Sequence, residues 1–241
     1  MRRAFSFRPR WWQTLLTLFF CALFLRLSVW QVHRYHEKLA LQNAFTLKSA
    51  APSIDFKQFH MQLMHKTDMR YTPVKLTGHF LLPAIFLLDN QMRGSAVGYH
   101  VLSLFELTKS HEKVLINRGW IPLYRRDILP NIPTPTQTLT LNTFSVYPPQ
   151  KIIVLSSTLI DNQTWPMRIE AIDLQTIEHA THQTIFPMVF LLKQASPAGF
   201  LREWSPENLH ATQSKVYAVQ WVLFAVTLLI IYFILNFKRG K

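Results

Sequence analysis

The sequence contains little cysteine and glycine, and both shortages exclude kinds of site. Cys21 is the single cysteine among 241 residues, so the chain has no internal disulfide, no CxxC redox motif, no CxxCH haem-attachment motif and no zinc-ribbon spacing. Its six glycines are scattered, and they form neither a phosphate-binding loop nor a dinucleotide fingerprint. We therefore expect neither nucleotide-driven activity nor chemistry based on paired thiols.

Acidic residues are also scarce, with 13 Asp and Glu against 26 Lys and Arg. No HExxH, no GxSxG and no close carboxylate pair is present, which leaves few groups for general acid–base catalysis. The pairs His33/His36 and His179/His182 have helical spacing, but solvated histidines explain them more simply, and we predict no metal site. We expect a protein that is not an enzyme; an active site assembled from scattered His, Asp and Arg residues is the alternative.

Two long apolar segments frame the chain. Residues 11–30 and 216–237 are apolar apart from a few polar residues, among them Arg26 and Gln220. As helices they would be about 30 and 33 Å long, enough to cross a bilayer. A cleaved signal peptide is the alternative for the first segment, but no small-x-small cleavage motif follows it. We expect two transmembrane helices at 11–30 and 216–237.

Basic residues flank both apolar segments on their outer sides. By the positive-inside rule, residues 1–10 and 238–241 are cytoplasmic tails, and residues 31–215 form a periplasmic domain attached to a bacterial inner (plasma) membrane. Much of the net charge of +13 lies in these tails, so we expect contact with membrane lipid and none with nucleic acid. The basic residues concerned are Arg2, Arg3, Arg8, Arg10, Lys238, Arg239 and Lys241.

The pattern between the apolar segments is mostly that of strands. Residues 31–50 continue the first helix, residues 54–63 form a short helix, and residues 168–180 form an amphipathic one. Strands are predicted at 71–76, 85–89, 97–107, 114–117, 138–146, 152–155 and 185–192. This order predicts an antiparallel, strand-rich α+β domain that could close partly into a barrel.

Seven stretches, in order along the chain, match one known family: WQVHRYHEK, RYTPVKLTGHF, LLDNQMRGSAVGYHVL, VLINRGWIP, WPMRIEAID, GFLREW and YAVQW. With these stretches the chain resembles the surfeit locus protein 1 family of cytochrome c oxidase assembly factors, and the resemblance covers nearly the whole chain. The motif residues are Trp30, Gln31, Arg34, Lys38, Gly78, Asn117, Arg118, Gly119, Trp120, Tyr217, Gln220 and Trp221.

The resemblance implies a chaperone-like assembly factor for a haem-copper terminal oxidase. Such a protein would assist insertion or retention of haem a in subunit I, with subunit I and other assembly factors as partners and haem a as a transient cofactor. The family usually has a histidine three residues before the tyrosine of YAVQW, and here that residue is Ser214. His210 is the nearest possible haem contact, and a scaffold that binds no haem is the rival interpretation.

Elementary chemistry suggests roles for the motif residues. We expect Gly119 to permit a turn at a strand end, Trp120 to fix that turn in apolar packing and Gly78 to close another strand. Arg34 and Lys38 share a helical face, where lipid phosphates, haem propionates or the partner could meet them.

Aromatic and polar residues also mark the start of the second span. Tyr217, Gln220 and Trp221 are expected to contact the partner subunit, because polar and aromatic groups at this depth are otherwise costly to bury. Ordinary interfacial anchoring explains them equally well.

Overall fold

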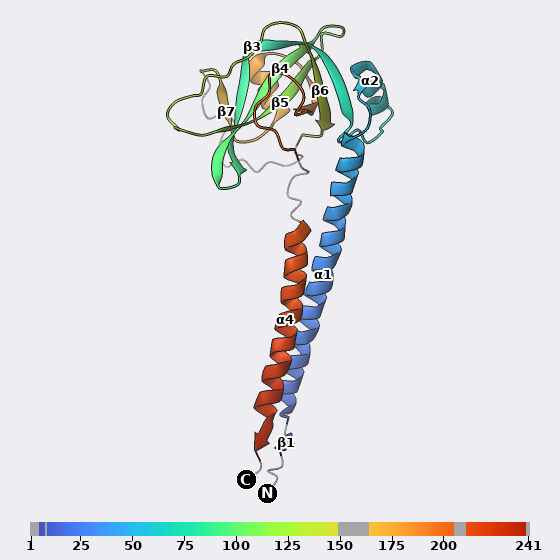
Figure 1. Cartoon of the computed structure of the whole chain (residues 1–241), viewed down its shortest axis with the longest axis vertical. Helices are drawn as coiled ribbons and strands as arrows, with labels where there is room; N and C mark the ends of the chain where they lie inside the picture. The colour runs from blue at the N-terminus through green and yellow to red at the C-terminus, as the bar shows by residue number, and fades with distance from the viewer. Residues whose placement is uncertain (1–4, 8, 149–163, 205–210, 240–241) are drawn as a thin grey trace. The chain divides into compact units, whose positions relative to one another are not determined.

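The computed structural model describes residues 5–7, 9–148, 164–204 and 211–239. The chain divides into two compact units (Figure 1). The helix unit consists of Met1–Phe45 and Ser205–Lys241, and the sheet unit is Thr46–Trp204. The strand predicted at 152–155 and His210 both lie outside the described residues.

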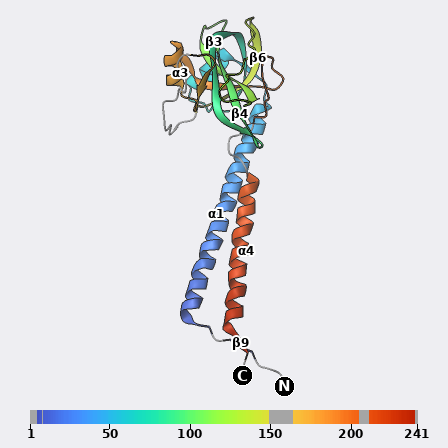
Figure 2. The same ribbon diagram turned by 90° about the vertical axis from the view of Figure 1, so that its left-hand side faces the viewer.

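Two helices dominate the helix unit. The first predicted span and its continuation form one helix, α1 (Trp11–Ser49), and the second span lies within α4 (Ala211–Asn236). The continuation beyond residue 30 is therefore confirmed. The two helices lie side by side in both Figure 1 and Figure 2. Short strands β1 (Phe5–Phe7) and β9 (Phe237–Arg239) pair antiparallel at the chain ends.

Small and polar residues line the seam between α1 and α4. Each step of seven residues along α1 matches a step of seven residues backwards along α4, the repeat of antiparallel helices packed knobs into holes. Small residues let the helix backbones approach closely. The pairs are the hydroxyls of Thr14 and Tyr232 (2.8 Å), Ser28 Oγ donating to the Ala218 carbonyl (3.0 Å), and the Cys21 thiol donating to the Ala225 carbonyl (3.9 Å).

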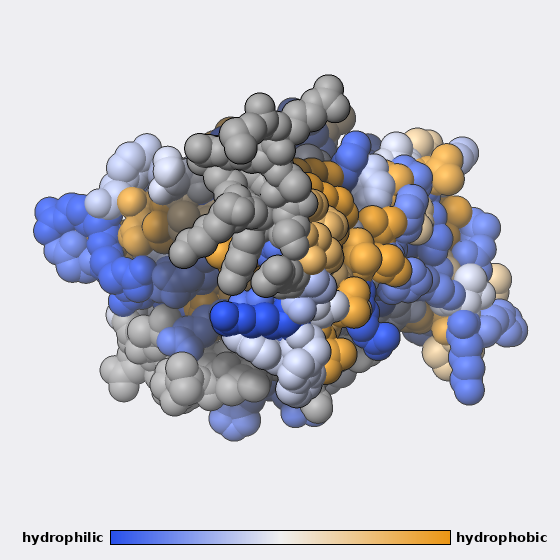
Figure 3. All heavy atoms as spheres, turned by 90° about the horizontal axis from the view of Figure 1, so that it is seen from below, coloured by the Kyte–Doolittle hydropathy of each residue, from blue (hydrophilic) through white to orange (hydrophobic). Residues whose placement is uncertain are grey.

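The faces of the two helices turned away from the seam are apolar and exposed. Leu18 and Phe19 on α1 and Ile230 and Ile234 on α4 are examples. Hydrophobic residues at the surface are also visible in the space-filling view (Figure 3). Both helices are long and apolar enough to cross a membrane. A helix that is apolar on all sides requires an apolar surrounding.

The sheet unit is built on a mixed seven-stranded sheet whose main strands form a ring. Its strands are β2 (Ile54–Asp55), β3 (Pro73–Arg93), β4 (Ala96–Leu107), β5 (Lys113–Pro122), β6 (Leu139–Val146), β7 (Met167–Ile169) and β8 (Ile185–Leu192). The neighbour order is β2-β3-β4-β5-β8-β6, and β6 also pairs with β3. The path from β3 through β4, β5, β8 and β6 therefore returns to β3.

The expectation of an antiparallel, strand-rich domain is only partly confirmed, because the sheet is mixed. The pairs β5–β8, β2–β3 and β3–β7 are parallel, whereas β3–β4, β4–β5, β3–β6 and β6–β8 are antiparallel. Parallel neighbours need a long crossover connection. The chain between β5 and β8 is long enough for this, and it contains β6 and helix α3 (Leu174–Thr181).

Two helices accompany the sheet. Helix α2 (Phe56–Met64) confirms the short helix predicted after residue 54, and Asp55 caps it by accepting a hydrogen bond from Gln58 N at 2.7 Å. The helix predicted at 168–180 is partly wrong, because Met167–Ile169 is strand β7 and α3 begins only at Leu174. Met167 and Ile169 are buried on either side of the less buried Arg168, which is the alternation of a strand.

Strand β3 corrects two expectations. It joins the predicted strands 71–76 and 85–89 into one strand of 21 residues, with a register shift against β4 between Phe80 and Ile85. Gly78 does not close a strand; it lies where β3 pairs with both β4 and β6. A side chain there would place Cβ 1.9 Å from the Glu106 carbonyl oxygen, so glycine permits a close backbone approach.

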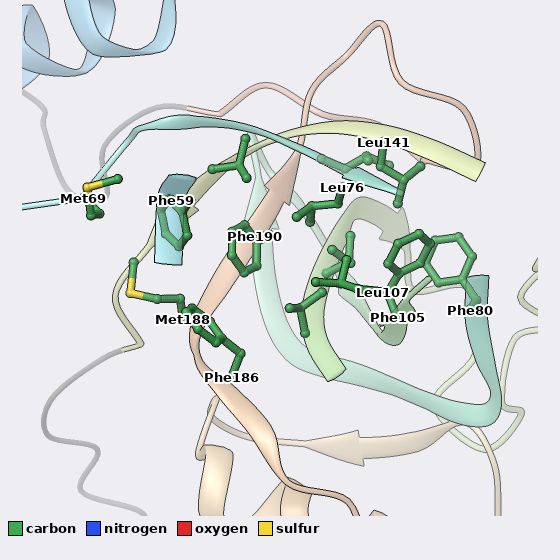
Figure 4. Close-up of a cluster of buried hydrophobic side chains, with 14 residues drawn as sticks. Phe59, Met69, Leu76, Phe80, Phe105, Leu107, Leu141, Phe186, Met188 and Phe190 are labelled. Atoms are coloured by element: carbon green, nitrogen blue, oxygen red, sulfur yellow. The ribbon is translucent and has the colours of Figure 1, made fainter. Parts of the chain in front are cut away.

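Buried aromatic and aliphatic side chains fill the sheet unit. One cluster joins α2 through Phe59 to β3, β4, β5, β6 and β8 (Figure 4). A second cluster joins β3, β4 and β5 to β7 and α3, with Phe86 and Ile177 among its members. The unit thus has apolar layers beneath both α2 and α3, which is enough burial to hold a domain without disulfides.

Candidate functional site

The motif residues predicted from the sequence fall into two groups, one in each unit. Gly78, Asn117, Arg118, Gly119 and Trp120 lie on β3 and β5 of the sheet unit. The remaining described motif residues lie on the two helices, and they are Trp30, Gln31, Arg34, Lys38, Tyr217, Gln220 and Trp221.

The centre of the first group is Arg118, which is 1% exposed. Its Nε donates to the Ala198 carbonyl at 2.8 Å, Nη2 donates to the Pro133 carbonyl at 2.7 Å, and Nη1 donates to Thr134 Oγ1 at 2.7 Å and, more weakly, to Ser103 Oγ at 3.4 Å. The guanidinium therefore ties β5 to two segments that are distant in the sequence.

The surroundings of the Arg118 guanidinium are polar but uncharged. The partners that the structure describes are carbonyl and hydroxyl oxygens, and the rings of Phe80 and Phe200 lie 4.7 and 5.0 Å from its central carbon. Burial lowers the pKa of Arg118 to about 10, because removing the cation from water penalises the charged form. At neutral pH the group still carries its proton, so its charge is held by dipoles and ring faces.

The residues after Arg118 have structural roles that differ from those expected. Gly119 lies inside β5 with φ +113°, and an added Cβ would lie 2.6 Å from the Leu201 carbonyl oxygen. The strand continues to Pro122, so there is no turn at residue 119. Trp120 is buried and its indole donates to the Gln91 carbonyl at 2.9 Å, which fixes it against β3.

His100 completes this group and was not predicted from the sequence. Its Nδ1 lies 3.4 Å from Asn117 Nδ2, and its ring meets the Trp204 ring edge to face at 5.5 Å. Burial lowers the pKa of His100 to about 4, so the ring is neutral at pH 7. Because an amide nitrogen can only donate, Nδ1 accepts and the proton lies on Nε2. The sequence signal was its place in the LLDNQMRGSAVGYHVL stretch, but nothing there indicates burial.

In the helix unit, Lys38 meets Ser214, the position at which the family resemblance led us to expect a histidine. Lys38 Nζ donates to Ser214 Oγ at 3.1 Å, and Ser214 is buried in the seam. Haem iron takes His, Cys, Met or Tyr as axial ligand, and a serine hydroxyl already engaged by an ammonium group supplies none of these. The residue present at this position therefore does not fit haem ligation.

Arg34 does not share the environment of Lys38. Arg34 Nη1 pairs with Glu37 at 2.8 Å and His33 Nε2 lies 3.3 Å from the same carboxylate, all three side chains being substantially exposed. Exposed ion pairs of this kind contribute about 0–1 kcal/mol to the free energy of unfolding. They leave the Arg34 guanidinium accessible to an external anion.

The aromatic and amide residues of the helix unit divide between seam and outer surface. Trp221 is partly buried and stacks on Phe24 with ring centroids 5.7 Å apart, and Gln31 is also partly buried. Trp30, Tyr217 and Gln220 are exposed. The structure thus gives Trp221 a packing role within the helix pair and leaves Tyr217 and Gln220 open.

The chemistry available in either group is binding and positioning. Among the residues that the structure describes, no three His, Cys, Asp or Glu side chains lie close enough to hold a metal ion. The described pairs His60–Glu112 and His111–Glu106 are partly exposed contacts at 3.2 and 2.8 Å. His210 lies outside the described residues.

Comparison with known proteins assigns the family. A family model described as the SURF1 family matches residues 18–226. A curated relative, the "Cytochrome oxidase assembly protein SHY1" of Saccharomyces cerevisiae (strain ATCC 204508 / S288c), is 34% identical over 96 residues. That alignment covers 39% of this chain and 24% of the yeast protein. Because the family model spans both units and far more than half of the sequence, the chain belongs to the SURF1 family.

Proposed function

We propose that the chain is a membrane-attached assembly factor for a cytochrome oxidase of the haem-copper type. The observation that carries this proposal is the match of the family model to residues 18–226, joined to the printed name of the yeast relative. The aligned segment is about a quarter of that relative, and the oxidase role is inferred for this chain from it.

Membrane attachment is supported by the surfaces of α1 and α4. Their seam contains the polar groups, and their outward faces are apolar and exposed, as expected for two helices whose surrounding is lipid. We place the spans at 11–30 and 216–237 in a bacterial inner membrane, with cytoplasmic tails at 1–10 and 238–241. Residues 31–215 then form the periplasmic part.

The mode of action that we infer is scaffolding without catalysis. The ring of paired strands is interpreted as a small closed barrel, a rigid body in which Arg118 holds the segments around Pro133 and Ala198 against β5. Tyr217 and Gln220 remain exposed on α4. In the bilayer an exposed amide side chain is stabilised most by a hydrogen bond to another protein. We therefore propose these residues as contacts to oxidase subunit I.

The role toward haem a is the finer part of the proposal. We propose that the chain assists insertion or retention of haem a in subunit I by holding the apoprotein, together with other assembly factors. The Lys38–Ser214 contact favours a version in which haem is not ligated at residue 214. A scaffold that never binds haem is therefore the second candidate.

Gene deletion tests the assembly role. Deletion should lower cytochrome oxidase activity and the haem a absorbance of membranes, and the wild-type gene should restore both. Unchanged oxidase activity after deletion would refute the proposal. A Gln220→Leu variant should recover less subunit I in a pull-down than the wild type, whereas Thr227→Leu, a matched exposed polar position on α4, should recover as much.

A spectrum of the purified protein separates the two candidates. Chain purified in detergent from cells that make haem a should show a haem a band if the chain carries haem, and His210→Ala should then lose it. If no haem copurifies and His210→Ala still supports oxidase activity, the chain acts as a scaffold alone.

A further inference from the structure

Exposed apolar side chains of the sheet unit gather at the tip of the β3–β4 hairpin. Met92 is 62% exposed and pairs directly across the hairpin with Val97. The segment after β5 lies against the same tip, because Leu123 N donates to the Val97 carbonyl at 3.0 Å. This segment exposes Tyr124 (89%) and Ile128 (53%). We call Met92, Val97, Tyr124 and Ile128, with the neighbouring arginines Arg93, Arg125 and Arg126, the tip patch.

The two segments of the tip patch are fixed to each other. Arg126 Nη1 pairs at 2.9 Å with the buried carboxylate of Asp89 on β3, and its Nη2 donates to Asn90 Oδ1 at 3.3 Å. The apolar side chains are therefore presented together rather than on independent loops. Soluble surfaces seldom group exposed side chains of this size without a partner.

Each of the three arginines of the tip patch is paired with a carboxylate, and two of these carboxylates are exposed. Arg126 is held by the buried carboxylate of Asp89. Arg125 and Arg93 pair with Asp127 and Glu203, whose side chains are 63% and 74% exposed, so phosphates can replace both carboxylates. Apolar and tyrosyl side chains rimmed by arginine are the composition that settles in the headgroup region of a bilayer.

The chain that connects this patch to the second predicted span is short. Arg93 Nη2 lies 2.9 Å from Glu203, and only 12 residues lie between Glu203 and Val216, where the second predicted span begins. Extended chain to Ala211 followed by helix reaches at most roughly 35 Å. A weakly binding surface confined within this distance of a membrane faces a high effective lipid concentration.

We propose that the tip patch inserts into the lipid headgroup region of the membrane to which α1 and α4 are attached. Tyr124, Ile128 and Met92 enter the apolar boundary, and Arg93 and Arg125 contact lipid phosphates. The inference rests on the proposed membrane attachment. It gives the sheet unit a second, reversible lipid contact in addition to the helices.

Site-directed fluorescence on the full chain tests this inference. Since Cys21 is the single cysteine, a Cys21→Ala chain accepts one environment-sensitive label at Ile128→Cys, in nanodiscs of phosphatidylethanolamine and phosphatidylglycerol. The label should shift to the blue and be quenched by brominated lipid, and Tyr124→Ser should reduce the quenching. Met64→Cys on α2, 72% exposed, is the matched control and should stay unquenched.

A third label separates failure of this inference from failure of the proposed function. Phe19→Cys, on the outward face of α1, should be quenched whenever the helices are in the bilayer. Quenching at residue 19 with a water-like label at residue 128 overturns the inference and leaves the membrane attachment intact. An unquenched label at residue 19 overturns both. If residue 128 is shielded only when oxidase subunits are added, the patch binds protein and the lipid proposal is wrong.

Discussion

Replacing Arg118 with methionine should destabilise the sheet unit by about 2 kcal/mol, the difference between two larger effects. The side chain makes three short hydrogen bonds, to the Ala198 and Pro133 carbonyls and to Thr134 Oγ1. Hydrogen bonds from a charged donor contribute about 1.5–2 kcal/mol each at the lower end of their range, or about 5 kcal/mol together. Methionine fills most of the volume but leaves these acceptors unsatisfied.

The opposing effect is relief of desolvation. Burial lowers the pKa of Arg118 to about 10, which corresponds to a cost of roughly 3 kcal/mol for keeping the cation inside the fold. Methionine removes this cost, whereas lysine keeps it and cannot reproduce the fork geometry. Arg118→Lys should therefore be at least as destabilising as Arg118→Met.

Thermal unfolding of the full chain in detergent, followed by tryptophan fluorescence, measures the effect. A loss of about 2 kcal/mol should lower Tm by about 4–8 °C in a domain of this size. Arg125→Met is the matched control, because Arg125 is exposed and pairs only with neighbouring Asp127 in the part that the structure describes; its Tm should stay within about 2 °C of the parent. An Arg118→Met chain as stable as the Arg125→Met chain would refute the reasoning.

Three further predictions concern titration, backbone space and helix packing. Burial lowers the pKa of His100 in the folded chain to about 4, below its ordinary value. The free energy of unfolding should therefore fall by up to about 3 kcal/mol as the pH drops from 6.5 to 4. Denaturant titrations at several pH values should show that this fall is smaller in His100→Gln. Gly119→Ala should cost more than about 3 kcal/mol, since the positive φ and the Leu201 contact act together, whereas Gly94→Ala, with open space around it, should cost about 1 kcal/mol. Cysteines at Ser28 and Ala218 in a Cys21→Ala chain should crosslink on oxidation.

Each of these predictions has a contradicting outcome. If the His100→Gln chain loses as much stability at acid pH as the parent chain, another group causes the pH dependence. Equal losses in the two glycine variants would show that the Cβ clash at residue 119 is relieved by movement. Cysteines at Val29 and Val219, both exposed, should not crosslink within one chain, and efficient crosslinking there would refute the seam register.

Periodicity predicted the helices and most strands because the apolar face of each is continuous. The long helix α1, the capped helix α2 and strand β8 follow directly from such patterns. The segment 168–180 was misread because the isoleucines of β7 and α3 happen to lie at helical spacing across the boundary. Parallel pairing of β5 with β8 is set by contacts distant in the sequence, which local patterns do not contain.

The sequence identified residues of the candidate site, but it did not predict which groups they contact. The sequence indicated Arg118 and Gly119, but two of the four acceptors of the guanidinium are backbone carbonyls, which every residue carries and no sequence pattern marks. The contact between Lys38 and Ser214 joins two helices far apart in sequence. The seven-residue spacing of Thr14, Cys21 and Ser28 was a readable signal for the seam.

Strand β8 lies between β5 and β6, so the sheet ring needs residues 185–192 before it can close. During synthesis, β5 and β6 each keep one edge unpaired until this late segment has been made. The segment that completes the ring is made shortly before α4. A chain interrupted ahead of Ile185 would therefore expose the unpaired edges of β5 and β6 and much of the phenylalanine-rich interior. Such a chain would be a substrate for quality-control proteases.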